Sequence, residues 1–314
     1  MVLPGLDSHM TPLITNYTPM KFKSNALLVL TLVAFFGLWS CGPKGDKDKN
    51  SSEFDEAQKS LKQEIKDIAY NIPPPSEIPY LLQQTGAEFN QSLINDRKKA
   101  DAYGSQPDKA ALNLGVFTAD IGYLSSYEKT QESIDYLNAC KNLADKLGVT
   151  GSFDRATLKK FEDNIANKDS LAALLDDAIK KTDKYLKDGN RSKLGALLVT
   201  GSFVESLYIS TGIIKSYPKN ILPDDTRNLV LTPLIRIIID QKKSVGEVTK
   251  MLSSVDQTGP IPTIVADLKS LESSYNSLNI EDQIKNNKAN LVLSDKNLEE
   301  ITRLVEKLRG DIVQ

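Results

Sequence analysis

Apolar residues recur along most of this chain with the 3.6-residue period of an amphipathic helix, and the alternating runs typical of strands are scarce. We therefore expect an all-α protein, either a multi-helix bundle or an irregular, TPR-like α-solenoid of about ten helices. Capping residues, glycines and prolines indicate the boundaries. The pattern predicts helices over residues 54–72, 78–94, 105–124, 131–147, 152–165, 169–186, 192–214, 224–251, 264–278 and 294–308.

Two of these segments, 110–124 and 194–214, are apolar or small almost all round, so each should be buried on several sides. Both contain a Leu-Gly pair, and both carry one acid in an otherwise apolar face, Asp120 in the first and Glu205 in the second. Duplication of a helical hairpin would explain this internal echo. Independent burial of two unrelated helices is the alternative explanation, which we prefer.

Asp120 and Glu205 are the strongest candidates for chemistry. A lone carboxylate on an apolar helix should have a raised pKa or a buried partner. Two such acids facing each other could act as an acid–base pair, as in glycoside hydrolysis. Arg236, in the apolar run 229–239, is the counter-ion that we expect. The alternative, which we prefer, is a structural polar network of these three residues in the core.

The N-terminal region has the organisation of a secretion signal. Lys21 and Lys23 precede 13 apolar or small residues (26–38), and Ser40 lies directly before Cys41. Thirteen helical residues span roughly 20 Å, short of the roughly 30 Å hydrocarbon core of a bilayer. A small residue followed by cysteine resembles the lipobox of bacterial lipoproteins. The resemblance implies a signal peptide over residues 20–40, cleavage before Cys41 and lipidation of its thiol; an uncleaved anchor is the rival interpretation.

The regions on either side of this signal extend the interpretation. Residues 1–19 are expected to be a non-native or mis-assigned extension, because signal peptides begin close to their charged region. Residues 41–52 are small, polar and rich in alternating charge, which predicts a flexible tether before one all-helical domain over residues 53–314. By resemblance to Gram-negative lipoproteins, Gly42 rather than Asp after the cysteine favours the outer membrane over the inner. The periplasmic or surface-exposed side stays open.

Composition excludes several classes of function. His9 and Trp39 are the only residues of their kinds and both precede Cys41, so the processed chain would lack the imidazole of Ser–His, Cys–His and HExxH sites. We expect no metal and no cofactor. From Cys41 onward the charge is about −3, which offers no footprint for nucleic acid. Cys140, on an apolar helical stripe, is expected to be a buried, inert thiol.

Several segments also carry a family resemblance. They are Ile72–Ile78 (IPPPSEI), Gly86–Asn90 (GAEFN), Ala111–Tyr123 (ALNLGVFTADIGY), Tyr136-Leu137 and Leu143–Gly148 (LADKLG). Together they resemble an uncharacterised family of all-helical lipoproteins of the Bacteroidota, over roughly residues 70–215. The chain departs from that family at Phe117 and Thr118, where Tyr and Gly are usual. The resemblance implies an all-helical envelope lipoprotein and no particular activity.

These observations lead to one expected function and two alternatives. We expect a membrane-anchored lipoprotein that acts as a non-enzymatic binding or scaffolding module for an envelope protein partner. The first alternative is an envelope hydrolase that uses Asp120 and Glu205 on glycan or peptide. The second is a small-ligand carrier with a pocket between helices.

Overall fold

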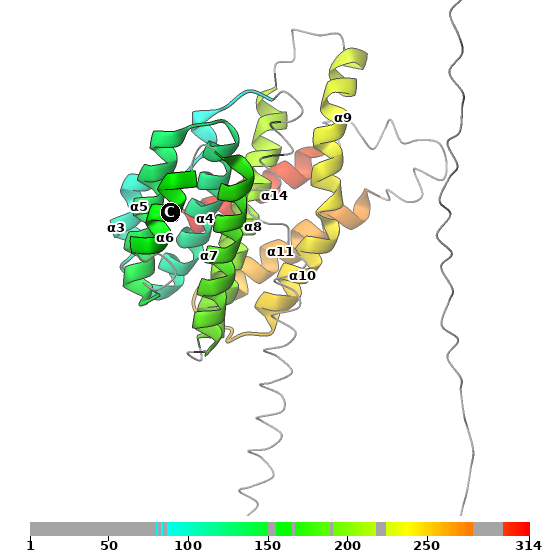
Figure 1. Ribbon diagram of the computed structural model, residues 1–314. Coiled ribbons are helices and arrows are strands. Elements are labelled where there is room, and N and C mark those ends of the chain that lie inside the picture. Colours follow the sequence, from blue (N-terminus) through cyan, green and yellow to red (C-terminus); the bar gives the residue numbers. More distant parts are fainter. Residues whose placement is uncertain are drawn as a thin grey trace, which may run out of the picture. The chain divides into compact units, whose positions relative to one another are not determined.

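The computed structural model of the chain describes Tyr80, Gln83 and residues 87–149, 155–164, 167–188, 191–217, 224–278 and 298–314 (Figure 1). These residues all belong to one compact unit and contain helices without any strand, so the predicted all-α class is confirmed. The signal peptide, Cys41, the tether, the helix predicted over 54–72 and the helix start predicted at 294 lie outside the described residues.

The elements are helical throughout. In chain order they are the 3₁₀ turns η1 (Gln91–Leu93) and η2 (Arg97–Lys99), then α3 (Ala100–Tyr103), α4 (Pro107–Ser126), α5 (Thr130–Leu147), α6 (Arg155–Asn164), α7 (Lys168–Asp188), α8 (Ser192–Ser216), α9 (Asp224–Asp240), α10 (Lys242–Ser253), α11 (Ile261–Ser277) and α14 (Glu299–Ile312).

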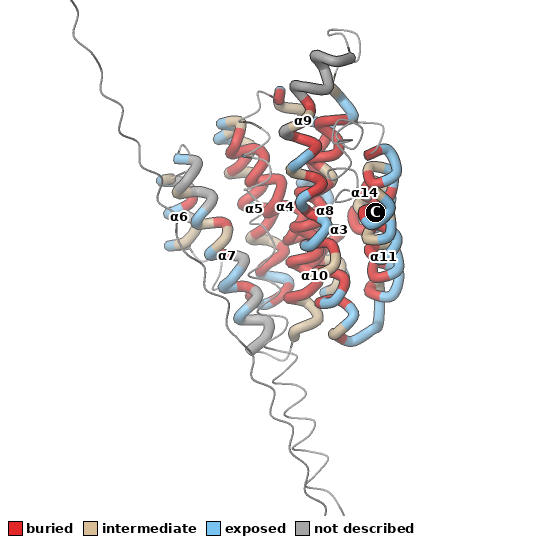
Figure 2. Tube along the Cα trace, turned by 90° about the vertical axis from the view of Figure 1, so that its right-hand side faces the viewer, coloured by how far each residue is buried: buried red, intermediate tan, exposed pale blue. Residues whose placement is uncertain are grey.

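Helices α4 and α8 form the centre of the unit, and Figure 2 shows both as buried along most of their length. Asp108 in the first turn of α4 pairs with Lys193, 85 residues later, in the first turn of α8. Asp120 contacts Glu205 farther along with the same separation in sequence. A constant separation means that the two helices run parallel. The prediction that both segments are buried on several sides is confirmed.

Two glycines allow the backbones of α4 and α8 to touch. A Cβ atom on Gly115 would lie 2.0 Å from the carbonyl oxygen of Leu198, and one on Gly201 would lie 2.0 Å from that of Leu112. The contact is reciprocal, since each glycine lies against the residue three positions before the other. Gly201 is therefore the counterpart of Gly115 at the crossing. The sequence similarity between the two Leu-Gly pairs had instead matched Gly115 with Gly195.

The remaining helices surround this pair. Helices α3 and α5 pack on α4, whereas α7 packs on α8 and α4 and carries α6 on its outer side. Helices α9 and α10 contact α8, α11 contacts α10, and α14 lies against α8 and α11. Solenoid repeats contact only their neighbours in sequence. Because α4 packs on α8 across the intervening helices and α14 returns to α8, the arrangement is a bundle.

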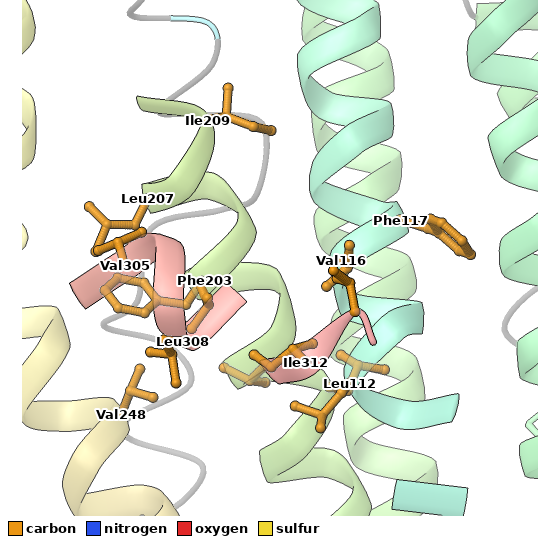
Figure 3. Packing of buried hydrophobic residues seen from close by; sticks show 14 of the residues in the cluster. Leu112, Val116, Phe117, Phe203, Leu207, Ile209, Val248, Val305, Leu308 and Ile312 are labelled. Atoms are coloured by element: carbon orange, nitrogen blue, oxygen red, sulfur yellow. The ribbon is translucent and has the colours of Figure 1, made fainter. Parts of the chain in front are cut away.

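Helix α14 is held by an apolar stripe. In Figure 3, Phe203 and Leu207 of α8 lie close to Val305 and Leu308 of α14. Full burial of one such side chain contributes roughly 1.5–3 kcal/mol. The buried residues of α14 are Ile301, Leu304, Val305, Leu308 and Ile312.

Two predicted boundaries are wrong. The helix expected over 78–94 does not continue to its predicted end, because residues 87–90 are not helical and the Asn90 side chain caps the short turn η1 by accepting from the Ser92 N–H. The helix expected over 224–251 is two helices, α9 and α10. It breaks at Gln241, whose N–H donates to the carbonyl three residues back, at Ile238. Among the described residues, α14 begins at Glu299 with Leu298 at its N-cap, and the start predicted at 294 is not tested.

Candidate functional site

The structure brings Asp120 and Glu205 together. They lie on α4 and α8, beyond the close crossing at Gly115 and Gly201, and both are 0 % exposed. Their carboxyl groups are close enough for each acid to affect the pKa of the other. The absence of Cβ atoms at the crossing is what lets two short acidic side chains from different helices reach each other. We call Asp120, Glu205 and the arginine described next the acid–arginine cluster.

The counter-ion of this cluster is Arg309, from α14. Its Nε donates to Oε2 of Glu205 at 3.0 Å, and one terminal nitrogen donates to Oε1 at 3.1 Å. This forked pairing satisfies both oxygens of Glu205 and is among the stronger hydrogen-bonded arrangements of charged groups. The guanidinium also lies over the ring of Tyr208, 4.5 Å from its centroid, and the side chain is only 15 % exposed.

The prediction that Arg236 is the counter-ion of the two acids is wrong. Arg236 lies on α9 with its side chain exposed, while the neighbouring residues Leu234, Ile235 and Ile238 are buried. The apolar run 229–239 concealed which side of the helix faces the core. Arg309 had a visible signal, since it lies four residues after Val305, at the edge of the apolar stripe of the last helix.

Burial and charge set the protonation of the two acids. Burial, and next the charge of Glu205, raise the pKa of Asp120 well above its ordinary value, against the opposing effects of Arg309 and of the Asn95 N–H. Burial also raises the pKa of Glu205, and here Arg309 opposes the effect through its charge and its hydrogen bonds. Asp120 therefore holds its proton more readily than a free aspartic acid, next to a Glu205 carboxylate that Arg309 neutralises.

Asn95, in the loop between η1 and η2, connects this cluster to its surroundings. Its N–H donates to Oδ2 of Asp120 at 3.2 Å. Its side-chain amide donates to the Tyr103 hydroxyl at 3.1 Å, and its carbonyl accepts from the hydroxyl of Tyr136. The loop, α3, α4 and α5 thus meet in one buried hydrogen-bond network.

The same network holds the C-terminal end of the chain. The Tyr103 hydroxyl donates to the carbonyl of Val313 at 2.9 Å, and Lys99 donates to the same oxygen at 3.1 Å. The side-chain amide of Asn113 donates to the carbonyl of Ile312 at 3.1 Å. Sequence reasoning missed these contacts because their acceptors are backbone carbonyls. Asn113 was nevertheless a visible signal, as a polar residue within a helix that is otherwise apolar.

The two acids of the cluster are fully buried, which limits their chemistry. A general acid or base must come within hydrogen-bond reach of its substrate, and neither Asp120 nor Glu205 is exposed. In the part of the chain that the structure describes, no group of three or more His, Cys, Asp or Glu residues is placed to hold a metal ion. Cys140 is buried and burial raises the pKa of its thiol, as expected of an inert cysteine.

A pocket of about 350 Å³ lies elsewhere, between the C-terminal end of α8 and the start of α14. Lys215 and Glu306 form an ion pair at its wall. Ligand pockets are mostly apolar with a few polar groups, and four of the seven residues that line this one carry a charge. Its residues are Ile214, Lys215, Leu298, Glu299, Thr302, Arg303 and Glu306.

Among the described residues, one helix, α8, is long and apolar enough to meet the length and hydropathy criteria for a membrane span. Its apolar window is 94 % buried inside the protein, so the apolar side chains are used in the packing of the bundle. Comparison of the chain with protein-family models, with curated proteins and with solved structures finds no match.

Proposed function

We propose that this protein is a lipid-anchored component of a bacterial envelope whose helical unit binds or scaffolds another envelope protein. One observation carries the proposal: Lys21 and Lys23, the apolar segment 26–38 and Ser40-Cys41 follow one another in the order of a lipoprotein signal. Attachment of several acyl chains at Cys41 would anchor the chain firmly, whereas a single chain binds a membrane only marginally.

The described unit supports a binding role more than a catalytic one. Asp120 and Glu205, the acids that a hydrolase would use, are fully buried, and Arg309 occupies both oxygens of Glu205. Their hydrogen bonds connect helices to one another. The hydrolase alternative would need both acids in a wet cleft, about 5–10 Å apart, with room for a sugar.

Lipidation can be tested by labelling cells with an alkyne analogue of palmitate. The wild-type chain should take up the label, and Cys41→Ser should abolish both labelling and cleavage of the leader, as seen by the mass of the product. Cys140→Ser is the matched control, because Cys140 is the other cysteine of the chain and is buried. It should be labelled like the wild type. Labelling that persists in Cys41→Ser would contradict the proposal.

The partner can be sought by photo-cross-linking in living cells. A photoreactive residue at Asn138, Lys243 or Lys269 would sample exposed positions on α5, α10 and α11. An affinity tag should follow Gln314 through a flexible linker, because Val313 is buried. A single envelope protein cross-linked from one of these positions, and lost in Cys41→Ser, supports the scaffold role. The absence of any cross-linked protein from all three positions speaks against it.

A further inference from the structure

We propose that Asp120 and Glu205 form a buried proton-binding site, in which one proton is held between the two carboxyl groups and is required for stable packing of α4 against α8.

Hydrogen bonding around the two acids requires this proton. Glu205 accepts from Arg309 at both oxygens, as an ionised carboxylate does. Asp120 accepts from the Asn95 N–H at Oδ2, while no group of the described residues donates to its Oδ1. An ionised carboxyl group can only accept, so two ionised acids in contact would share no hydrogen. A proton on Oδ1 of Asp120 supplies the donor for its bond to Glu205.

The balance of charge points the same way. Arg309 and Glu205 are the charged groups that act on Asp120, and one arginine balances one carboxylate. With Asp120 ionised, a second negative charge would be left in the dry interior, where an unpaired charge is costly. Asp120 and Glu205 in turn act on the buried phenols of Tyr103 and Tyr136. A phenol is uncharged at neutral pH even at its ordinary pKa of 10.0, and burial raises the pKa of both further.

The remaining titratable groups near the cluster do not supply a positive charge to balance Asp120. Cys140 on α5 faces Asp120 as a thiol whose pKa burial raises, and Tyr208 on α8 lies under Arg309. Asp96 and Arg97, next to the loop, act on Tyr136 with opposite signs. A proton on Asp120 is therefore the means by which this interior becomes neutral.

The proton makes the stability of the unit depend on pH. The folded pKa of Asp120 is raised above its ordinary value of 3.8, so between these two pKa values the folded chain binds a proton that the unfolded chain has released. Stability from this group is greatest below the ordinary pKa and falls as pH rises toward the folded pKa. Within that window the ratio of folded to unfolded protein drops about tenfold for each pH unit.

A direct test is infrared spectroscopy of the purified full-length chain at pH 7, in mild detergent because segment 26–38 is apolar. The wild type should show the carbonyl stretch of a protonated carboxyl group, and that band should be missing from the spectrum of Asp120→Asn. An identical spectrum in this region for the two proteins would overturn the proposal.

Chemical unfolding between pH 5 and pH 8 gives the second test. Asp120→Asn carries an amide that donates and accepts as the protonated acid does, so it should fold, depend less on pH than the wild type and match or exceed its stability at pH 8. Glu205→Gln leaves Arg309 without a counter-ion and should be weakened at every pH. Failure of Asp120→Asn to fold, or an unchanged pH dependence, would contradict the proposal.

Discussion

Gly201 of α8 lies so close to Leu112 of α4 that a Cβ atom on the glycine would come within 2.0 Å of the leucine carbonyl oxygen. No side chain can move aside there, because the neighbour is backbone. The approach of the two helices, and with it the meeting of Asp120 and Glu205 farther along, depends on the absence of that one atom and of its counterpart at Gly115.

Gly201→Ala should therefore destabilise the unit by about 3 kcal/mol, because α4 and α8 must separate to make room and overpacking of this kind costs roughly 1–3 kcal/mol or more. Gly115→Ala should behave alike. The measurement is the midpoint of urea unfolding, followed by helical circular dichroism.

Gly310→Ala is the matched control for this prediction. Gly310 is also helical, but a Cβ atom on it would meet nothing within 4 Å. Alanine is intrinsically the better helix former by roughly 0.5–1 kcal/mol, so this variant should be neutral or slightly stabilised. Equal losses at Gly201 and Gly310 would show that helix contact is not what the glycine at the crossing provides.

Arg309→Met should destabilise the unit by about 3–5 kcal/mol, because it leaves the Glu205 charge buried and unpaired. Arg309→Lys should be only partly tolerated, since an ammonium group cannot reproduce the forked contact with both oxygens. Thermal unfolding at pH 7 measures both effects. Arg303→Met, which breaks an exposed pair with Glu300 on the same helix, should leave the midpoint unchanged.

Tyr103→Phe should loosen the C-terminal end of the chain. The variant removes a buried hydroxyl that donates to the carbonyl of Val313, at a cost of roughly 1–3 kcal/mol, and amide exchange in the last turn of α14 should become faster. Tyr275→Phe removes a comparable buried bond, from the Tyr275 hydroxyl to the carbonyl of Ile238. This control should lower stability without a selective effect on α14.

Cys140 should resist thiol reagents until the bundle opens. Its thiol is buried, and burial raises its pKa, so the reactive thiolate is scarce in the folded protein. In a Cys41→Ser background, labelling with a maleimide should be slow in buffer and complete in denaturant. Fast labelling of the folded protein would mean that α5 opens far more readily than its packing indicates.

The helical period of the apolar residues was sufficient for the fold class and for most helices. Gly148 illustrates why: its left-handed φ of 68° ends α5 where the sequence predicted a C-terminal glycine. Such signals act within a few residues and need no knowledge of the rest of the chain. The prediction of a single helix over 224–251 was wrong, because the chain turns at Gln241 through a hydrogen bond to the carbonyl three residues back. The apolar pattern continues through this turn and gives no sign of it.

The two acids of the candidate site could be predicted from the sequence, whereas their arginine partner could not. Asp120 and Glu205 stand out because an acid in an apolar helix must find a partner, which is a rule about the residue itself. Arg309 could not be chosen over Arg236 by the same rule, since both are cations beside apolar residues, and the choice depends on which helix reaches Glu205.

The sequence by itself determined the all-α class, most of the helices, the two buried central segments and the presence of acids that need neutralising, because each follows from local periodicity or from the cost of burying a charge. Only the tertiary structure decided that Gly115 and Gly201 bring α4 and α8 into contact, that Arg309 forms the ion pair with Glu205, and that Asn95 connects the acids to the C-terminal carbonyls. Glu205 and Arg309, for example, are 104 positions apart in the sequence, and pairings of this kind are selected by geometry in space and not by the pattern along the chain.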